Sequence, residues 1–364
     1  MNTGNYWKKA VVNDLLSTAS SICNANMDKR TFIKTLGLGM AAWPVATSGP
    51  AALHRYHPAI HPPTIRKGDT VGVITPSSAL VDDEGYPIAE ANFEALGLRL
   101  QWGKHVGKKW GYLAGKDEER LADLHTMFAD PAVKAIVCLR GGSGGARLLD
   151  KLDYGLIARN PKIFMGYSDI TAFHQAIHAQ TGLITFHGPV ANSRWTPMVF
   201  DQFKALFFEG SLPVYSANQR PVRTLGSGTA EGKLLGGNLT VLTGLAGSRY
   251  YPDFTDSILF LEDIGEEPYR IDRMFSQLAL SGALQRIKGF IFGRCSDCEA
   301  SNPGNSLTLD QILDDYIKPL GIPAYQGALI GHMDEQFILP VGARVRMDAD
   351  IGSITVMENI FAAG

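Results

Sequence analysis

The chain has 364 residues, of which 45% are hydrophobic and 19% charged, and its formal net charge is -2 at pH 7. This is the composition of a globular protein long enough for two domains of about 100–200 residues each. The near-neutral charge and the lack of a basic-aromatic stripe argue against nucleic-acid binding. No run of about 20 residues in the predicted folded body is apolar enough to span a bilayer.

Residues 1–64 are predicted to be a leader and linker. The segment Asp28-Lys-Arg-Thr-Phe-Ile-Lys34 precedes a mildly apolar stretch and then small residues around Pro50. This order is typical of an export signal, and the basic pair resembles a twin-arginine signal with Lys29 in the first Arg position. We therefore expect a periplasmic protein, whose start could equally be Met27. The alternative is an amphipathic helix that packs on the domain of a cytoplasmic protein.

Residues 65–200 alternate between apolar runs and helical patterns, which predicts a Rossmann-like parallel sheet covered by helices on both faces. The expected strands are Thr70–Thr75, Ala135–Leu139 and Lys162–Met165. The expected helices between and after them are Ile88–Leu100, Asp117–Ala129, Ala146–Leu152 and one from Asp169 that stops at Gly182. Ligands of such sheets bind at the carboxyl ends of the strands.

Gly166-Tyr-Ser-Asp169 connects one of these strands to the next helix. A serine on a strand-to-helix turn has an exposed hydroxyl beside the first helical N–H groups, which suits a nucleophile and an oxyanion. Serine is also a good helix cap. These four residues alone do not distinguish a nucleophile from a cap.

The irregular, Pro- and Gly-containing segment 201–228 is predicted to be a linker, followed by a β-rich α/β domain over 229–364. Its expected elements are strands at Ser257–Leu261, Gly289–Phe292, Ala324–Ile330, Ala343–Met347 and Ile351–Met357, with helices at Ile271–Leu280 and Leu309–Ile317.

A serine nucleophile needs a base, and the base needs an orienting acid. Among nine histidines, His332 follows an apolar run and opens a polar loop, as a residue at the carboxyl edge of a strand would. By the same argument Glu262 ends the strand Ser257–Leu261, although Asp263, Glu266 and Glu267 compete for the role.

Three other patterns are weaker. His174 and His178 have the spacing of a zinc helix, but Gln175 stands where such helices carry glutamate. The run from Gly142 to Arg147 approaches a dinucleotide loop without its last glycine. Cys138 is expected to be buried. Cys295 and Cys298 lack two further zinc ligands, so a local disulfide is the better interpretation if the chain is exported.

Together these residues resemble the LD-carboxypeptidase family of serine peptidases, which includes the microcin C immunity peptidases. The resemblance covers Ile65 to Glu358 in five blocks: Gly68-Asp69 to Pro76-Ser77; Arg140-Gly-Gly with Arg147-Leu-Leu-Asp150 and Leu152-Asp-Tyr154; Gly166-Tyr-Ser-Asp169; Leu261-Glu-Asp263 with Tyr269 and Asp272-Arg273; and Gly331-His332 with Leu339-Pro-Val-Gly342.

The resemblance implies that Ser168 is the nucleophile, Glu262 the orienting acid and His332 the general base. It places the oxyanion hole at the backbone N–H of Asp169 plus that of Gly141 or Gly142. It also implies a site between a Rossmann-like domain and a β-rich domain, usually in a homodimer. Ser143 departs from the family, in which an aromatic residue commonly follows Gly-Gly, so the substrate preference is open.

The expected reaction is removal of the terminal D-Ala from a murein tetrapeptide, with no metal or other cofactor. Arg140 and Arg294 are candidates for binding the substrate carboxylate. A second hypothesis keeps the triad but makes the substrate an aminoacyl-nucleotide conjugate, for which Trp195 or Tyr269 would stack on the base. A third is a non-catalytic envelope protein that binds muropeptides.

Overall fold

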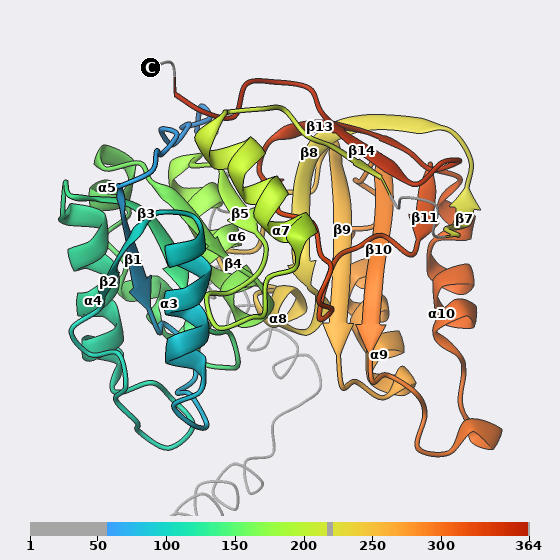
Figure 1. Ribbon diagram of the computed structural model, residues 1–364. Helices are drawn as coiled ribbons and strands as arrows, with labels where there is room; N and C mark the ends of the chain where they lie inside the picture. Colours follow the sequence, from blue (N-terminus) through green and yellow to red (C-terminus); the bar gives the residue numbers. More distant parts are fainter. Residues whose placement is uncertain (1–56, 217–220, 363–364) are drawn as a thin grey trace, which may run out of the picture. The chain divides into compact units, whose positions relative to one another are not determined.

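The computed structural model describes residues 57–216 and 221–362, so the predicted export signal lies outside the described residues. The described residues form one compact unit built on two sheets. In Figure 1 most of the first sheet is blue to green, and most of the second is yellow to red.

The first sheet has six strands in the order β12-β5-β4-β3-β1-β2. They are β1 (Thr70–Ile74), β2 (Arg99–Trp102), β3 (Val133–Cys138), β4 (Ile163–Gly166), β5 (Thr185–His187) and β12 (Leu339–Val341). All neighbours are parallel except β12 and β5. The inner strands are apolar and buried, as Val73, Val137 and Phe164 show, because helices cover the sheet.

These helices are α3 (Gly85–Ala95), α4 (Asp117–Ala129), α5 (Tyr154–Arg159) and α6 (Thr171–Thr181). Helix α6 ends at Gly182, whose φ of 78° provides the expected left-handed cap. Helix α3 ends earlier than expected, before Gly97 with φ 70°, and the following residues form β2 instead. The predicted helix after the glycine loop is a 3-10 helix over Gly145–Lys151.

The second sheet has eight strands in the order β6-β14-β13-β8-β9-β10-β11-β7. They are β6 (Val214–Ser216), β7 (Arg223–Gly226), β8 (Thr229–Asn238), β9 (Ser257–Ile264), β10 (Gly289–Ser296), β11 (Ala324–Gln326), β13 (Arg344–Asp348) and β14 (Ser353–Val356). The central strands β8 to β11 are parallel, and the outer pairs are antiparallel. The accompanying helices are α8 (Leu239–Gly244), α9 (Pro268–Leu280) and α10 (Leu309–Tyr316).

The expected linker 201–228 is more structured than its composition indicates. It holds the end of α7 (Pro197–Phe203), a π-helical turn over Lys204–Phe208, and the strands β6 and β7 that edge the second sheet. The carboxyl-terminal half in turn supplies β12 to the first sheet. The sequence boundary therefore does not coincide with a simple division between the sheets.

Helix α6 joins the two sheets through β8. Gln175 Nε2 donates a 2.6 Å hydrogen bond to the carbonyl oxygen of Gly236, and the N–H of Asn238 donates to Thr171 Oγ1 at 2.9 Å. A Cβ at Gly237 would overlap the Thr171 side chain, so glycine is needed for this approach. These contacts place the carboxyl end of β8 beside the helix that follows β4.

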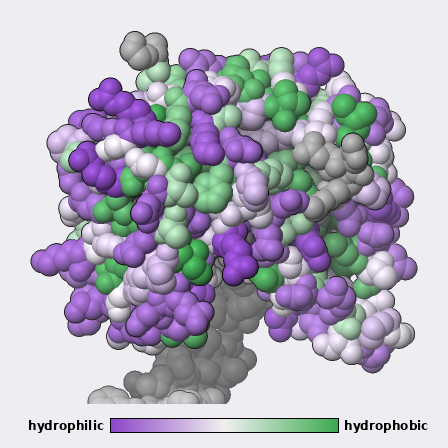
Figure 2. Space-filling model, in the orientation of Figure 1, coloured by the Kyte–Doolittle hydropathy of each residue, from purple (hydrophilic) through white to green (hydrophobic). Residues whose placement is uncertain are grey.

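On the face shown in Figure 2, apolar side chains form small separate patches among hydrophilic ones. Among the described residues, no helix has the length and apolar character that crossing a membrane requires.

Candidate active site

Ser168 stands on the turn between β4 and α6 with φ 63°, in the left-handed region that few residues other than glycine adopt. Such a turn presents the serine hydroxyl away from the sheet. The turn packs against the glycine loop, since a Cβ on Gly141 would lie 2.9 Å from Ser168 Cβ. The N-cap positions of the 3-10 turn and of α6 are held by Tyr167 and Ile170, so Ser168 is not the capping residue, which favours the nucleophile over the cap.

The glycine loop after β3 is held by three groups. Ser143 N–H donates to Ser78 Oγ at 2.9 Å, and Gly145 N–H donates to Asp169 Oδ2 at 2.7 Å. Gly142 has φ 110°, and a Cβ there would overlap the Ser78 side chain. The loop therefore needs glycine both for its conformation and for its packing.

Arg120 of α4 is the third group. Its guanidinium is fully buried and donates to the carbonyl oxygens of Gly144 at 3.0 Å and Pro76 at 2.6 Å. The Nη2 atom of the same guanidinium pairs with Asp117 Oδ1 at 2.6 Å. Sequence reasoning missed this arginine, because nothing in a helical pattern shows that its side chain points inward.

Glu262 and His332 form the acid–histidine pair. Glu262 lies near the end of β9 with no exposed side-chain surface, and its Oε2 lies 2.8 Å from His332 Nδ1. Gly331 allows this approach, since a Cβ there would lie 2.8 Å from the same oxygen. A carboxylate at Nδ1 holds the proton on that nitrogen and leaves Nε2 as the base.

The three competing carboxylates have other partners. Asp263 accepts hydrogen bonds from Asn238 and Thr240, Glu266 pairs with Arg270 at 3.5 Å, and Glu267 binds Ser301. Desolvation by burial raises the pKa of Asp263. Of the four candidates, Glu262 alone contacts His332 among the described residues.

Ser168 and His332 line one cavity of about 540 Å³. The lining also includes Arg140, Gly141, Gly142, Tyr167, Asp82 and Ile264. No hydrogen bond joins Ser168 Oγ to His332 within the part of the chain that the structure describes, and such bonds are often long until substrate binds. The structure thus brings the predicted nucleophile and base to the same space.

Tyr167 is a site residue that sequence reasoning did not single out. Its ring centroid lies 4.8 Å from that of His332, and it lines the same cavity. Burial, and then the nearby Glu262 charge, raise the pKa of Tyr167, so its hydroxyl stays neutral. Its position directly before Ser168 was the available signal.

The two candidate arginines differ in position. Arg140 lines the cavity and donates to the carbonyl oxygen of Ala79 at 2.7 Å. Arg294 is exposed, lies outside the cavity lining, and contributes its backbone N–H to Ile330 at 2.9 Å. Only Arg140 therefore reaches the space that Ser168 lines.

The histidines of α6 do not form a metal site. His174 bonds Thr185 Oγ1 at 2.9 Å and the carbonyl oxygen of Gly166 at 2.8 Å, whereas His178 packs on Gly342. Burial lowers the pKa of both to about 4. Among the described residues no cluster of three or more His, Cys, Asp or Glu could hold a metal ion.

The two cysteine predictions are confirmed. Cys138 is buried and free, and Cys295 forms a disulfide with Cys298 at the carboxyl end of β10.

Serine hydrolases on unrelated folds share this combination of a serine on a sharp turn and an acid–histidine pair at one cavity. The LD-carboxypeptidase N-terminal domain model matches residues 71–188, and the LD-carboxypeptidase C-terminal domain model matches residues 231–347. The chain therefore belongs to the LD-carboxypeptidase family and is a serine-type LD-carboxypeptidase.

Relatives of this chain include proteins named for murein peptides and one named for microcin C7 immunity. The "Probable murein peptide carboxypeptidase" of Bacillus subtilis is 44% identical over 79% of this chain and 91% of its own. The "Microcin C7 self-immunity protein MccF" of Escherichia coli is 31% identical over 83% and 96%. A solved MccF structure in complex with glutamyl sulfamoyl guanosine has a TM-score of 0.75 at 26% identity, covering 83% of this chain and 99% of that one. Muramoyltetrapeptide carboxypeptidase from Oxalobacter formigenes has a TM-score of 0.69 at 30% identity, covering 79% and 97%.

Proposed function

We propose that this protein removes the terminal D-Ala from murein tetrapeptides by hydrolysing an L,D-peptide bond. The observation that carries the proposal is the 2.8 Å contact between Glu262 and His332 at the edge of the cavity that Ser168 lines. The murein peptide carboxypeptidase of Bacillus subtilis, at 44% identity, supports the substrate class.

The chemistry follows from the positions of three side chains. Ser168 Oγ attacks the carbonyl carbon while His332 Nε2 accepts its proton, and Glu262 stabilises the resulting imidazolium. The tetrahedral oxyanion would accept hydrogen bonds from the N–H groups of Asp169 and Gly142. His332 then protonates the leaving amine of D-Ala, and water hydrolyses the ester by the reverse proton path.

Arg140 is the group proposed to bind the free carboxylate of the substrate. A carboxypeptidase must recognise that negative charge, and a guanidinium can bind it with two parallel hydrogen bonds. Arg140 is the arginine that lines the cavity among the described residues. Arg294 is not retained in this role because it is exposed outside the lining.

The surroundings of the site support a peptide over a nucleotide conjugate. Trp195 is 5% exposed, donates its Nε1–H to Val190 and packs on Phe93, so it belongs to the core. Tyr269 lines a different cavity, of about 520 Å³, and contacts Arg270 and Arg273. Neither Trp195 nor Tyr269, the two side chains expected to stack on a base, lines the cavity of Ser168.

Export and dimer formation are also proposed. The Cys295–Cys298 disulfide supports a periplasmic location, since disulfides persist in oxidising compartments. The homodimer rests on the family resemblance.

Replacing Ser168 with alanine tests the proposed function. Purified wild-type protein should release D-Ala from a murein tetrapeptide, and Ser168→Ala should lose this activity by a factor of about 10⁴ or more, because no other hydroxyl is set to attack. Its urea unfolding curve should match the wild type. A wild type that leaves the tetrapeptide intact but hydrolyses an aminoacyl-nucleotide conjugate would support the second hypothesis. Full turnover in Ser168→Ala would refute the triad.

A further inference from the structure

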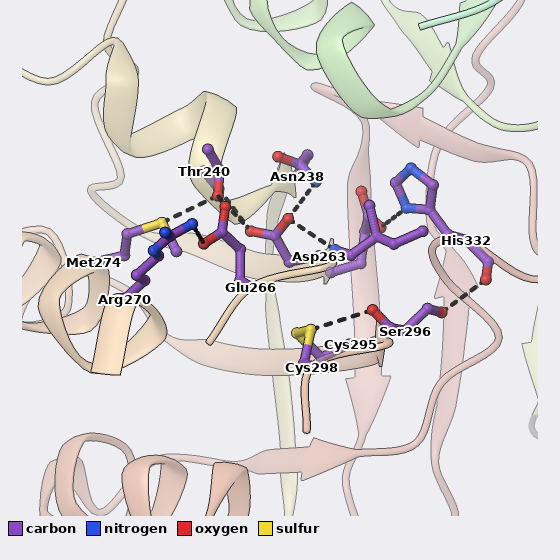
Figure 3. The surroundings of a disulfide bond; sticks show 12 residues. Asn238, Thr240, Asp263, Glu266, Arg270, Met274, Cys295, Ser296, Cys298 and His332 are labelled. Atoms are coloured by element: carbon purple, nitrogen blue, oxygen red, sulfur yellow. Dashed lines mark hydrogen bonds and ion pairs between the residues drawn. A yellow bond between two sulfur atoms is a disulfide. The ribbon is translucent and has the colours of Figure 1, made fainter. Parts of the chain in front are cut away.

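The backbone of His332 is tied to the second sheet by the side chain of Ser296. Ser296 is the last residue of β10 and is buried, and its hydroxyl donates a 2.8 Å hydrogen bond to the carbonyl oxygen of His332. Within the described residues, this is the hydrogen bond that connects the His332 backbone to a residue outside the loop 331–336. Figure 3 shows Ser296 between the disulfide and His332.

The end of β10 is shaped to present this hydroxyl. The register between β9 and β10 shifts between Phe292 and Cys295, and a bulge of this kind re-aims the side chains that follow it. Beyond it, the carbonyl oxygen of Ser296 accepts a 2.8 Å hydrogen bond from Gly265 N–H. Ser296 is thus fixed to the strand that carries Glu262.

The Cys295–Cys298 disulfide closes a four-residue ring around Ser296. Within the ring, Asp297 has φ 54°, a left-handed conformation that costs free energy outside glycine. Cross-linking the residues on both sides limits the alternatives open to this segment. Opening the ring would remove this restriction from the segment that carries Ser296.

We propose that Ser296, held in place by the Cys295–Cys298 disulfide, is a positioning residue for His332, and that reducing the disulfide lowers the hydrolytic activity. The proposal rests on the proposed function, in which His332 is the base. Glu262 fixes the imidazole ring at Nδ1, and Ser296 fixes the backbone of the same residue. Together the two contacts hold Nε2 toward the cavity. Either contact alone would leave the imidazole ring free to move.

The redox step is simple exchange. A dithiol reductant such as dithiothreitol gives two electrons and two protons to the disulfide, producing the Cys295 and Cys298 thiols and its own cyclic disulfide.

Steady-state kinetics on the murein tetrapeptide test the positioning role. Ser296→Ala should lower kcat about tenfold or more, because small displacements of a catalytic group are costly. KM should stay close to wild type, because Arg140 and the glycine loop are untouched. Ser296→Thr keeps a hydroxyl and should recover most of kcat. The matched control is Ser257→Ala, which removes a buried hydroxyl bonded to the carbonyl oxygen of Phe254 at 2.7 Å, at the other end of β9.

The disulfide is tested by reduction. Dithiothreitol should lower kcat of the wild type to that of Cys295→Ala/Cys298→Ala and should leave the double variant unchanged. If reduction leaves the kcat of the wild type unchanged, the proposed role of the disulfide is wrong. If Ser296→Ala has the kcat of the wild type, the positioning role of Ser296 is wrong.

Hydrogen exchange separates this proposal from the proposed function. Mass spectrometry should show faster exchange in peptides covering 331–336 for Ser296→Ala and for the reduced protein, but not for Ser257→Ala. This measurement needs no substrate, so it decides the inference even if the tetrapeptide is not hydrolysed. Equal exchange in all variants would overturn it.

Discussion

Ser168 adopts a backbone conformation that suits glycine better than serine, with φ 63°. Such positions cost of order 1–3 kcal/mol and persist where neighbouring contacts leave no alternative. Here the Asp169 carboxylate binds Gly145 N–H at 2.7 Å, and Gly141 allows the glycine loop to meet the turn. The nucleophile and the loop that would stabilise its oxyanion therefore form one structural unit.

Gly142→Ala should disrupt this unit. The added Cβ would overlap the Ser78 side chain, and φ 110° is unfavourable for alanine, so the loop must move and displace an oxyanion donor. We expect kcat/KM to fall by about 10²–10³ and the free energy of unfolding to fall by about 1–3 kcal/mol. Tetrapeptide kinetics and urea unfolding measure the two effects.

Gly282→Ala is the matched control for this change. Gly282 also has a positive φ of 73°, but a Cβ there would meet nothing within 4 Å. This variant should lose stability and keep wild-type kcat/KM. If Gly142→Ala and Gly282→Ala have equal kcat/KM, the assignment of Gly142 to the oxyanion hole is wrong.

Among the elements, α4 shapes the site without reaching the cavity. The Arg120 guanidinium connects α4 to the loops after β1 and β3 through the carbonyl oxygens of Pro76 and Gly144. The Asp117 carboxylate beside it also pairs with Arg147 at 3.0 Å, and this contact is the main reason that the pKa of Asp117 is lowered. A buried network of this kind determines how two separate loops face each other.

Arg120→Met should therefore affect both stability and catalysis. The methionine fills part of the buried space, but two carbonyl oxygens lose their donor and Asp117 loses one of its cations. Breaking a buried pair costs about 3–5 kcal/mol, which urea unfolding would detect. Since Gly144 is no longer held, kcat should fall as well. Arg147→Met removes the half-exposed partner of Asp117 and should lower the free energy of unfolding by less than about 1 kcal/mol. A loss as large as that of Arg120→Met would contradict the role assigned to Arg120.

The elements differ in how far the sequence could predict them. Asp117–Ala129 is the helix that its pattern indicated. The apolar runs of β3, β4 and β9 are strands, as expected from short continuous apolar runs that end in turn residues. The three-residue strands β5 and β12 are too short for this, and their pairing depends on contacts far apart in the chain. The strand expected over Ala324–Ile330 stops at Gln326, where Gly327 has φ 105°.

In the described molecule as a whole, Ser168 follows β4 of the first sheet and Glu262 lies on β9 of the second. His332 lies on the loop between β11 of the second sheet and β12 of the first. The sequence placed each of them near the carboxyl end of a strand, but it could not show that these ends meet. The contacts of α6 with Gly236 and Asn238 on β8 bring the two edges together. The roles of the three residues stay a prediction that the Ser168→Ala experiment tests, whereas the cavity that Ser168 and His332 share is a property of the fold.

The same packing buries three histidines, which predicts how stability depends on pH. Burial lowers the pKa of His174 and His178 to about 4, and that of His187 well below 6.5. Well above pH 6.5 these groups are neutral in both the folded and the unfolded state and carry no penalty. As the pH falls below 6.5, the unfolded chain binds protons that the folded chain cannot, so stability falls with a slope of up to about 1.4 kcal/mol per pH unit for each histidine.

His187→Phe isolates one of the three. Both ring nitrogens of His187 lack hydrogen-bond partners in the described structure, and the ring contacts the aromatic rings of Tyr167 and Phe260. Phenylalanine keeps this packing without a titrating group, so stability at pH 7.5 should change by less than about 1.5 kcal/mol. The slope between pH 6.5 and 5 should decrease by up to about 1.4 kcal/mol per pH unit. Urea unfolding at pH 7.5, 6.0 and 5.0 measures both, and His187→Leu provides a smaller apolar side chain in case phenylalanine overpacks. An unchanged slope in both variants would mean that His187 already takes up its proton in the folded state.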